Sequence, residues 1–339
     1  MMTWSLPVTY TSRKRSPILM AVSTDGRLIQ GSNMTHGVLL LDGGLGQELI
    51  RRSPSPAHHH WSLQVMLEEP DLVAEVHRDF CDAGANIACL NTYAITRARL
   101  ARGQNLPPIG ELLDRARELG EQGAATSQNA DAAMIASLPP LVASYRPDTQ
   151  LPLEQAIGEY RELIALQKET VDGFLAETIP SISEAEAVLT AAEQEGVRIV
   201  LGLTVSDEDG QQLRSGESLA DALAAIERFD LLAVVVNCSK PEVIAEALAI
   251  LSESRFPFGA FANGFTSIDA LEPGGVVDVL EARKDLGPEQ YAAFAESWLD
   301  AGASVIGGCC EVGPDHIRAL STLLKSRGHE QLAWSDLAA

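Results

Sequence analysis

The sequence predicts a single-domain α/β protein built as a (β/α)8 TIM barrel. From residue 37 onward, eight short apolar runs alternate with longer amphipathic segments, the pattern of a parallel sheet with helical connections. A helix is expected after each of the eight runs, which fits a closed barrel better than an open sheet with a second domain. Polar clusters follow the runs, at the ends where such barrels carry their sites.

The predicted strands are the short apolar runs themselves. The third stops at Pro139-Pro140, because proline cannot continue a paired strand, and the fourth ends at Glu177. We expect strands over residues 38–41, 87–90, 134–138, 174–177, 199–205, 231–236, 258–262 and 304–306.

The predicted helices follow from apolar spacing and from end signals. Over residues 71–83 the apolar side chains mark one buried face, and Gly84 closes the helix. Ser183 with Glu186 resembles a capping box for the fourth helix, and Pro241 suits the first turn of another. The remaining helices are expected over residues 109–125, 153–171, 218–228, 288–301 and 314–324, with a loop or short lid over 266–285.

We divide the chain into three parts. Residues 1–36 are expected to be a disordered or mis-started N-terminal extension, because Met34 stands just ahead of the first strand. Their basic, acid-poor composition leaves an organelle-targeting segment as the alternative. Residues 37–327 are expected to form the barrel domain, and residues 328–339 a C-terminal tail.

Composition excludes several classes of function. The formal charge is −22, with 47 acidic against 25 basic side chains, so nucleic acid is not an expected partner. No apolar run reaches 18 residues, so no membrane span is expected. Five cysteines, an odd number in a long chain, make no disulfide framework and indicate a reducing, cytoplasmic setting. A homo-oligomer is compatible with the sequence.

Three cysteines at the ends of two predicted strands indicate a metal site. Cys309 and Cys310 follow two glycines that permit a bend, so both thiols can face one ion. Cys238 follows the sixth predicted strand. Thiolate-rich tetrahedral sites favour zinc (Zn2+), and three protein ligands leave the fourth position open, as in catalytic sites. For Cys81 and Cys89 we prefer the alternative that a free cysteine packs as a small hydrophobe.

Two carboxylates also stand at predicted strand ends. Asp42 is followed by Gly43, Gly44 and Leu45, whose backbone amides can reach a small anion. A simple tight turn is an equally open interpretation of that segment. Glu177 is either a solvated loop carboxylate or a ligand-binding group.

A Pro-rich loop carries three consecutive histidines, residues 58–60, followed by Trp61. Neighbouring histidines rarely face one ion, so a solvated loop is preferred to a metal site. Trp61 is expected to be a core or lid residue, or a wall for a cationic ligand through cation–π attraction. Asn237, beside Cys238 at a strand end, completes the predicted substrate-binding set.

Five motifs together resemble the zinc-dependent homocysteine S-methyltransferases, over residues 38–324. The motifs are Asp42-Gly43-Gly44, Ala83-Gly84-Ala85, Glu177-Thr178-Ile179-Pro180, Val236-Asn237-Cys238 and Gly307-Gly308-Cys309-Cys310. The resemblance implies that residues 37–327 are a homocysteine-binding methyltransferase domain. It would transfer a methyl group from a sulfonium or quaternary ammonium donor to L-homocysteine, giving methionine.

The resemblance also implies roles for individual residues. Cys238, Cys309 and Cys310 match the zinc ligands of the family. Asp42 and Glu177 match the positions that hold the amino group of homocysteine. The amides from Gly43 to Leu45 match the segment that receives its carboxylate.

The donor is the least determined part of the resemblance. The Glu-Thr-Ile-Pro string is most similar to the branch that uses S-methylmethionine or S-adenosylmethionine, whereas Trp61 aligns with a donor-side tryptophan of the betaine branch. Residues 91–93 and 143–147 depart from the S-methylmethionine branch. Betaine or dimethylsulfoniopropionate as donor, and selenocysteine or another thiol as acceptor, are therefore the alternatives. Outside enzymes, the alternative is a zinc-binding or redox-sensing barrel.

The predicted ligands suit thiol alkylation. A free thiol with a pKa of about 8.5 is a poor nucleophile at neutral pH, and zinc selects its thiolate form. Three cysteine thiolates keep the centre anionic, which leaves electron density on the acceptor sulfur and favours a cationic donor. We therefore assign Cys238, Cys309 and Cys310 to metal activation and the two carboxylates to orientation of the substrate.

Overall fold

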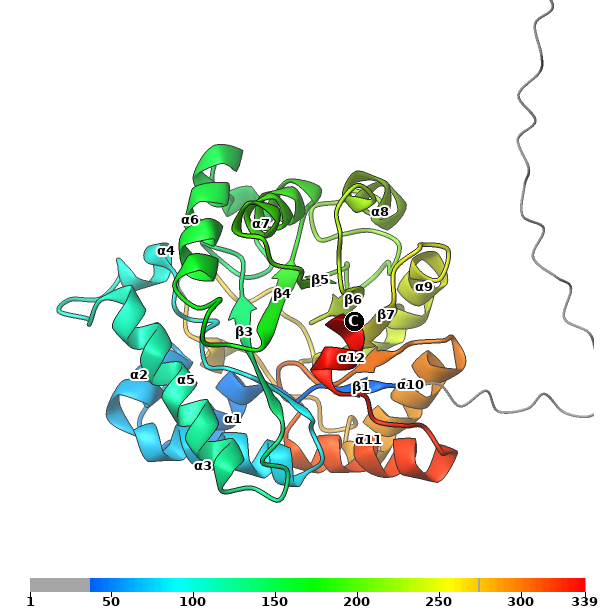
Figure 1. The fold of residues 1–339 in the computed structure, drawn as a ribbon, viewed down its shortest axis with the longest axis horizontal. Helices are drawn as coiled ribbons and strands as arrows, with labels where there is room; N and C mark the ends of the chain where they lie inside the picture. The colour runs from blue at the N-terminus through cyan, green and yellow to red at the C-terminus, as the bar shows by residue number, and fades with distance from the viewer. Residues whose placement is uncertain (1–36, 274, 339) are drawn as a thin grey trace, which may run out of the picture. The chain divides into compact units, whose positions relative to one another are not determined.

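Eight parallel strands pair in the order β1-β8-β7-β6-β5-β4-β3-β2, with helices around them (Figure 1). This computed structural model describes residues 37–273 and 275–338, so the extension predicted over residues 1–36 lies outside the described residues. Strands β1 and β2 meet through one bridge, Leu41 with Ile87, which closes the sheet on itself. The predicted (β/α)8 architecture is confirmed.

All eight predicted strands are present, with ends that differ by at most two residues. Their bounds are β1 (Leu39–Leu40), β2 (Ile87–Cys89), β3 (Ala133–Leu138), β4 (Gly173–Ile179), β5 (Val200–Leu203), β6 (Ala233–Asn237), β7 (Phe258–Phe261) and β8 (Val305–Ile306).

The predicted long helices are also present, together with short ones that the sequence did not indicate. Their bounds are α1 (Leu45–Arg52), α2 (Ser62–Glu68), α3 (Pro70–Asp82), α4 (Arg97–Leu100), α5 (Ile109–Ala125), α6 (Leu153–Ala165), α7 (Ile182–Glu195), α8 (Leu219–Ile226), α9 (Pro241–Leu251), α10 (Pro288–Asp300), α11 (Pro314–Arg327) and α12 (Trp334–Ala338), with 3-10 turns η1 (Pro147–Thr149) and η2 (Val277–Val279). The prediction that Ser183 caps α7 was wrong, because Ser181 Oγ accepts the N–H of Glu184 at 3.2 Å.

Side chains alternate between the barrel interior and the helix-facing layer, as the two-residue repeat of a strand requires. In β6, Ala233 and Val235 belong to the interior cluster, whereas Val234 and Val236 pack against the helices. The same alternation makes the interior position polar at the C-terminal end of four strands. These four residues are Cys89, Ser137, Glu177 and Asn237. The interior is therefore apolar at its base and polar at its C-terminal mouth.

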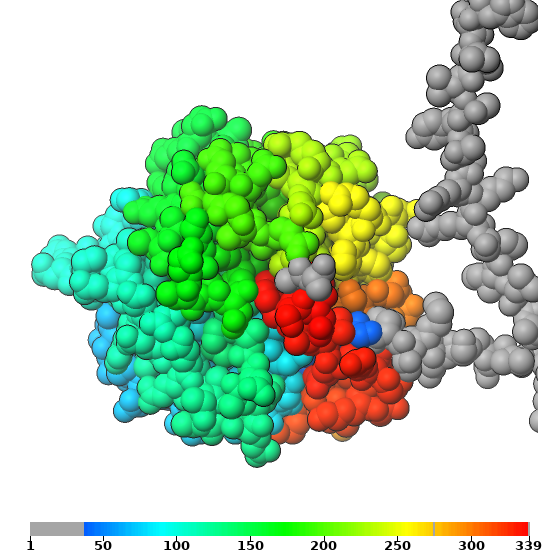
Figure 2. Space-filling view, in the orientation of Figure 1, coloured from blue at the N-terminus to red at the C-terminus, as the bar shows by residue number. Residues whose placement is uncertain are grey.

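The residues after α11 pack against the opposite end of the barrel. The N–H of Val38 donates to Glu330 O at 2.8 Å, and the N–H of Leu332 donates to Val38 O at 2.9 Å. Trp334 is 6% exposed and belongs to the interior cluster. Helix α12 lies over the centre of the strands in Figure 1, and the red C-terminal residues cover the middle of this face in Figure 2. The segment predicted as a tail thus covers the barrel base.

Among the described residues, no helix combines the length and the apolar character needed to cross a membrane.

Candidate active site

A cavity lies at the C-terminal ends of the strands, where parallel barrels carry their sites. Nine of the ten residues predicted to bind metal or substrate line it. Most come from strand ends or the loops that follow them, whereas Leu45 begins α1 and Trp61 directly precedes α2. The nine are Asp42, Gly43, Gly44, Leu45, Trp61, Glu177, Cys238, Cys309 and Cys310. The segment after β7, where the sequence predicted a loop or lid, contributes Leu271, Val277 and Leu280 to the same cavity.

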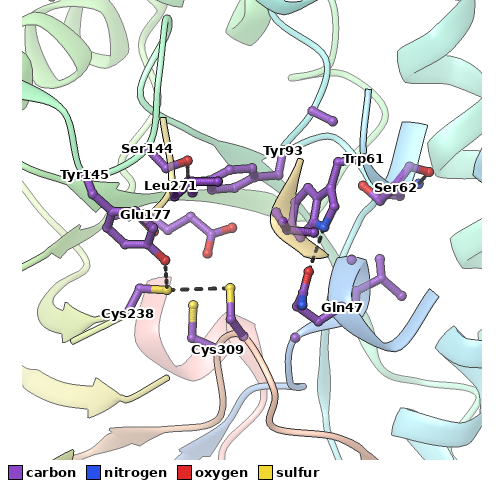
Figure 3. Close-up of a pocket in the computed structure, with 18 of the residues that line it drawn as sticks. Gln47, Trp61, Ser62, Tyr93, Ser144, Tyr145, Glu177, Cys238, Leu271 and Cys309 are labelled. Atoms are coloured by element: carbon purple, nitrogen blue, oxygen red, sulfur yellow. Dashed lines mark hydrogen bonds between the residues drawn. The ribbon is translucent and has the colours of Figure 1, made fainter. Parts of the chain in front are cut away.

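The three predicted metal ligands converge. The sulfurs of Cys238, Cys309 and Cys310 all lie within 4.8 Å of one another, and those of Cys238 and Cys310 are 3.8 Å apart (Figure 3). Two thiolates bound at about 2.3 Å to one tetrahedral ion would be roughly 3.8 Å apart. The three cysteines are free and therefore fit one thiophilic metal ion.

The backbone at Cys238 is held in a conformation unusual for a residue with a side chain. Its φ is 54°, just after β6, and Asn263 Nδ2 donates to the Cys238 carbonyl at 2.8 Å. The N–H of Cys238 donates to Phe261 O at 3.1 Å. These two hydrogen bonds, to residues of β7 and the segment after it, hold the backbone of Cys238 in this conformation. A regular strand conformation would direct the Cys238 side chain differently.

The two glycines before Cys309 are required for close packing. A Cβ on Gly307 would lie 2.6 Å from the Leu41 Cβ, and one on Gly308 would lie 2.1 Å from a methyl carbon of Val312. Neither glycine has a positive φ. They let the loop that carries the cysteines pack closely against Leu41 and Val312. The sequence analysis explained these glycines by freedom to bend alone, and that explanation was incomplete.

Tyr145 is a site residue that the sequence analysis did not identify. Its hydroxyl lies 2.9 Å from the sulfur of Cys238, and its φ is 64°. The guanidinium of Arg214 lies 5.0 Å from the centre of the tyrosine ring and also donates to the Cys238 carbonyl at 3.2 Å. Arg214 is itself paired with Asp207 at 2.9 Å. A single aromatic residue in a loop gives no sequence signal for this contact.

The ionisation of the three thiols is shared. Burial opposes ionisation of Cys238, yet hydrogen bonds from Cys309, Cys310 and Tyr145 lower its pKa well below that of an ordinary thiol. Burial and the neighbouring sulfurs raise the pKa of Cys309. Burial also raises the pKa of Tyr145, so its hydroxyl stays protonated and donates. Hydrogen bonds from the neighbouring groups thus favour the thiolate form of Cys238.

Two carboxyl groups, the buried Asp42 and the half-buried Glu177, lie in the cavity with the sulfurs. Asp42 is 1% exposed and accepts the Cys89 N–H at 2.8 Å, and Glu177 accepts a hydrogen bond from the Ser137 hydroxyl. Burial raises the pKa of Asp42 to about 7 and that of Glu177 to about 8. Among the described residues no Lys or Arg forms a direct ion pair with either group, although the charge of Arg99 acts on Glu177 from a distance and opposes the rise in its pKa. A buried carboxylate without a cation partner is suited to an ammonium group.

The glycine segment after Asp42 packs tightly and leads into α1. The Gly44 N–H donates to Val312 O at 3.0 Å, and the Leu45 N–H donates to Gly43 O at 2.9 Å. These two predicted anion donors are therefore used within the protein. The amides of Gly46 and Gln47, in the first turn of α1, have no acceptor among the described residues, as is usual at a helix start.

Asn237 lies behind the cavity. Its side-chain oxygen accepts the Thr178 N–H at 2.8 Å, its Nδ2 donates to Thr178 Oγ1 at 3.1 Å, and the residue is fully buried. Thr178 follows Glu177 and has a φ of 62°. The structure thus places Asn237 where it fixes the backbone next to Glu177, without contact to the cavity.

Trp61 is held over the first turn of α1. Its Nε1 donates to Gln47 Oε1 at 2.8 Å, and Gln47 Nε2 donates to Glu311 Oε1 at 2.7 Å. A Cβ on Gly46 would lie 2.3 Å from the Trp61 ring. The ring also meets Tyr93 edge to face at 5.7 Å (Figure 3). Trp61 is therefore a fixed aromatic wall of the cavity.

The histidines at residues 58–60 form a second group of metal-ligand atoms within 4.8 Å. The solvated-loop prediction was wrong for His60, which is 5% exposed. The His60 N–H donates to His58 Nδ1 at 3.2 Å, and neighbouring rings lie 3.9 to 4.2 Å apart. One nitrogen is thus already used by the backbone, and neighbouring rings are tilted by 35° and 57° to each other.

Comparison with known proteins points to one family. A family model described as homocysteine S-methyltransferase matches residues 39–324. The chain is 31% identical over 303 residues to the homocysteine S-methyltransferase of Escherichia coli (strain K12), covering 84% of this chain and 94% of that protein. It is 28% identical over 319 residues to a selenocysteine Se-methyltransferase of Brassica oleracea var. italica, covering 86% of this chain and 90% of that protein.

A solved structure resembles the whole described barrel. The homocysteine methyltransferase MmuM from Escherichia coli, in a metallated form, superposes with a TM-score of 0.71 at 27% identity. The alignment covers 85% of this chain and 96% of that chain. The sequence and structure matches therefore coincide with the barrel that carries the sulfur cluster.

Proposed function

The chain belongs to the homocysteine S-methyltransferase family, and from this premise we propose that it transfers a methyl group from a cationic donor to the thiol of L-homocysteine, giving methionine. One observation carries the proposal: three converging sulfurs share a cavity with the carboxyl groups of Asp42 and Glu177, which form no direct ion pair with a cation among the described residues. Such a site is suited to a metal ion and an amino-acid ammonium group at once.

We propose zinc as the metal, held by Cys238, Cys309 and Cys310. An all-sulfur donor set with a 3.8 Å sulfur separation supports this choice. When bound, zinc would lower the pKa of the acceptor thiol and keep its sulfur nucleophilic. The Tyr145 hydroxyl, 2.9 Å from Cys238, would stabilise negative charge on that ligand sulfur.

The acceptor is oriented by groups of opposite sign. Asp42 and Glu177 would hold its ammonium group, which would in turn lower their raised pKa values and keep both ionised. The N–H groups of Gly46 and Gln47 at the start of α1 would donate to its carboxylate, in place of the Gly44 and Leu45 amides. Two anchors on the amino-acid end would leave the thiol directed toward the cysteines.

The reaction needs no general base on the protein. The acceptor sulfur forms a bond to the methyl carbon, the bond from that carbon to the donor sulfur or nitrogen breaks, and the electron pair leaves with the donor. A cationic donor thereby becomes neutral. Trp61 and Tyr93 would form the wall that faces its positive charge.

The donor we favour is S-methylmethionine or S-adenosylmethionine, because the Glu177-Thr178-Ile179-Pro180 string resembles that branch. Betaine or dimethylsulfoniopropionate is the alternative, since Trp61 lines the cavity as expected for a donor-side tryptophan. A selenocysteine acceptor is also retained, because a relative bears that activity in its name. Five free cysteines are consistent with a reducing, cytoplasmic location.

The proposal is tested by assaying the purified protein with homocysteine and a panel of sulfonium and ammonium donors. We expect methionine to form with at least one donor, and to form at least about 1,000 times more slowly in Cys309→Ala. Formation of methionine by the Cys309→Ala variant at the wild-type rate would contradict the proposed site.

A further inference from the structure

Arg99, in the short helix α4, lines the cavity without a carboxylate partner among the described residues. Its side chain is half-buried. A guanidinium that is removed from water normally pairs with an anion. The missing partner is therefore expected to come from a ligand.

The contacts of Arg99 fix its position but include no direct ion pair, although its charge acts from a distance on the carboxyl groups of Glu177 and Glu184 and favours their ionised forms. One terminal nitrogen donates to the Tyr93 carbonyl and the other lies 3.3 Å from Ser144 Oγ. Its guanidinium carbon lies 4.9 Å from the centre of the Tyr93 ring, and the Tyr93 hydroxyl lies 2.8 Å from Ser144 Oγ. All these partners are neutral, and the five donors of a guanidinium are not exhausted by them. Burial lowers the pKa of Arg99, the direction expected when no anion is bound.

Arg97, two residues earlier on the same helix, provides the contrast. It is exposed and donates through two nitrogens to the two oxygens of Glu162, each at 2.6 Å. Arg97 does not line the cavity. The helix thus places one arginine in a surface ion pair and the other, unpaired, in the site.

The cavity has two electrostatic poles. The three cysteines, Asp42 and Glu177 bring acidic groups to one part of its lining, whereas Arg99 and Arg102 contribute cations. The exposed Glu272 also belongs to the lining and is paired with Arg146. In Figure 3 the partners of Arg99, Tyr93 and Ser144, lie on the other side of the Glu177 carboxyl group from the labelled cysteine sulfurs. A donor that carries both a sulfonium or ammonium group and a carboxylate matches this polarity.

We propose that Arg99 binds the carboxylate of the methyl donor and selects donors that carry one. The inference rests on the proposed function and deepens it. The donor is favoured over the acceptor because Arg99 stacks on Tyr93, whose ring meets Trp61 in the aromatic wall assigned to the donor cation. The carboxylate of the acceptor already has donors at the start of α1.

The experiment compares S-methylmethionine with its α-methyl ester, in which the carboxylate is masked, using homocysteine as acceptor. Wild type, Arg99→Gln, Arg99→Lys and the matched control Arg97→Gln are assayed with both donors. If betaine is the working donor, betaine and its methyl ester take their place. Each variant is also tested for the KM of homocysteine.

We expect Arg99→Gln to lower kcat/KM for the carboxylate donor by about 10- to 100-fold, the usual effect of losing a charged hydrogen bond. With the ester as donor, Arg99→Gln should lower kcat/KM by less than about 2-fold. Arg99→Lys should retain part of the preference for the acid over the ester, and Arg97→Gln should behave as wild type. An equal loss with ester and acid, no loss with either, or a raised KM for homocysteine alone would overturn the proposal.

Failure of the proposed function gives a different result. In that case none of the tested donors supports methylation of homocysteine by the wild-type protein. Binding of the same acid and ester is then measured directly by titration calorimetry. Preferential binding of the acid that disappears in Arg99→Gln would support the carboxylate site. Equal binding of the two compounds by wild type would overturn it.

Discussion

The hydroxyl of Tyr145 lies 2.9 Å from the sulfur of Cys238, although 93 residues separate them in the chain. Arg214 connects the same two residues, because it lies over the tyrosine ring and donates to the Cys238 carbonyl. The position of the first metal-ligand cysteine is therefore fixed by loops after three different strands. This contact is one of the hydrogen bonds, after those of Cys309 and Cys310, that lower the pKa of the Cys238 thiol.

Replacing Tyr145 with Phe tests that contact. Loss of one hydrogen bond to a charged sulfur should lower kcat/KM by about 10-fold. Metal content, measured by mass spectrometry of the purified protein, should stay at the wild-type level because the three sulfurs remain. Loss of the metal in Tyr145→Phe would contradict a role limited to charge stabilisation.

Replacing Glu177 with Gln tests the acceptor subsite. The variant retains the shape but cannot carry the negative charge that an ammonium group requires. We expect the KM for homocysteine to rise about 10-fold or more, with the KM for the donor within about 2-fold of wild type. Steady-state kinetics with each substrate varied in turn separate the two effects. A rise confined to the KM for the donor would contradict the assignment of Glu177 to the acceptor subsite.

The raised pKa of Asp42 predicts how stability depends on pH. Because the pKa is about 7 in the folded protein against an ordinary value of 3.8, the folded state binds a proton that the unfolded state releases. The stabilisation is present below about pH 4 and is lost as pH rises through 7. Urea unfolding without substrate should therefore show Asp42→Asn gaining stability over wild type between pH 5 and 8.

A matched control makes the Asp42 prediction specific. Asp131 is exposed, so Asp131→Asn should follow the wild-type curve of unfolding free energy against pH. An Asp42→Asn curve parallel to wild type across this range would show that burial does not perturb the Asp42 carboxyl.

Trp334 tests whether the C-terminal segment stabilises the barrel. Its side chain packs in the interior cluster at the base, so Trp334→Ala should lower the free energy of unfolding by about 3 kcal/mol. The site lies at the opposite end of the strands, so KM values of the remaining folded enzyme should not change. Unchanged urea stability would show that residues 328–338 are dispensable for packing.

The sequence was most informative where hydrophobicity or rare residue combinations are decisive. The eight strands were predictable because each is a short apolar run. The sulfur cluster was predictable because adjacent cysteines follow two glycines at one strand end. Helix α1 was not predicted, because its N-cap is Gly44 and no side chain caps it. The cap of α7 was placed two residues too late, because Ser181 and Ser183 offer the same local signal and only the fold distinguishes them.

The rest of the site depends on contacts between distant segments. Tyr145 lies in a loop and Arg99 in the short helix α4, both among residue types that give no sequence signal, and only the barrel brings them to the cavity. Asn237 stood at a strand end like the other site residues, yet its amide turns to Thr178. Strand alternation predicts which layer a residue belongs to, but not which partner takes its hydrogen bonds.

The central claim is that Cys238, Cys309 and Cys310 hold one catalytic zinc ion. Its most direct test is the zinc content of wild type, Cys309→Ala and the control Cys81→Ala, whose buried thiol lies outside the trio, with circular dichroism as the check of fold. We predict about one zinc per chain in wild type and in Cys81→Ala, and loss of the metal with a retained fold in Cys309→Ala. Full zinc occupancy in Cys309→Ala would contradict the account.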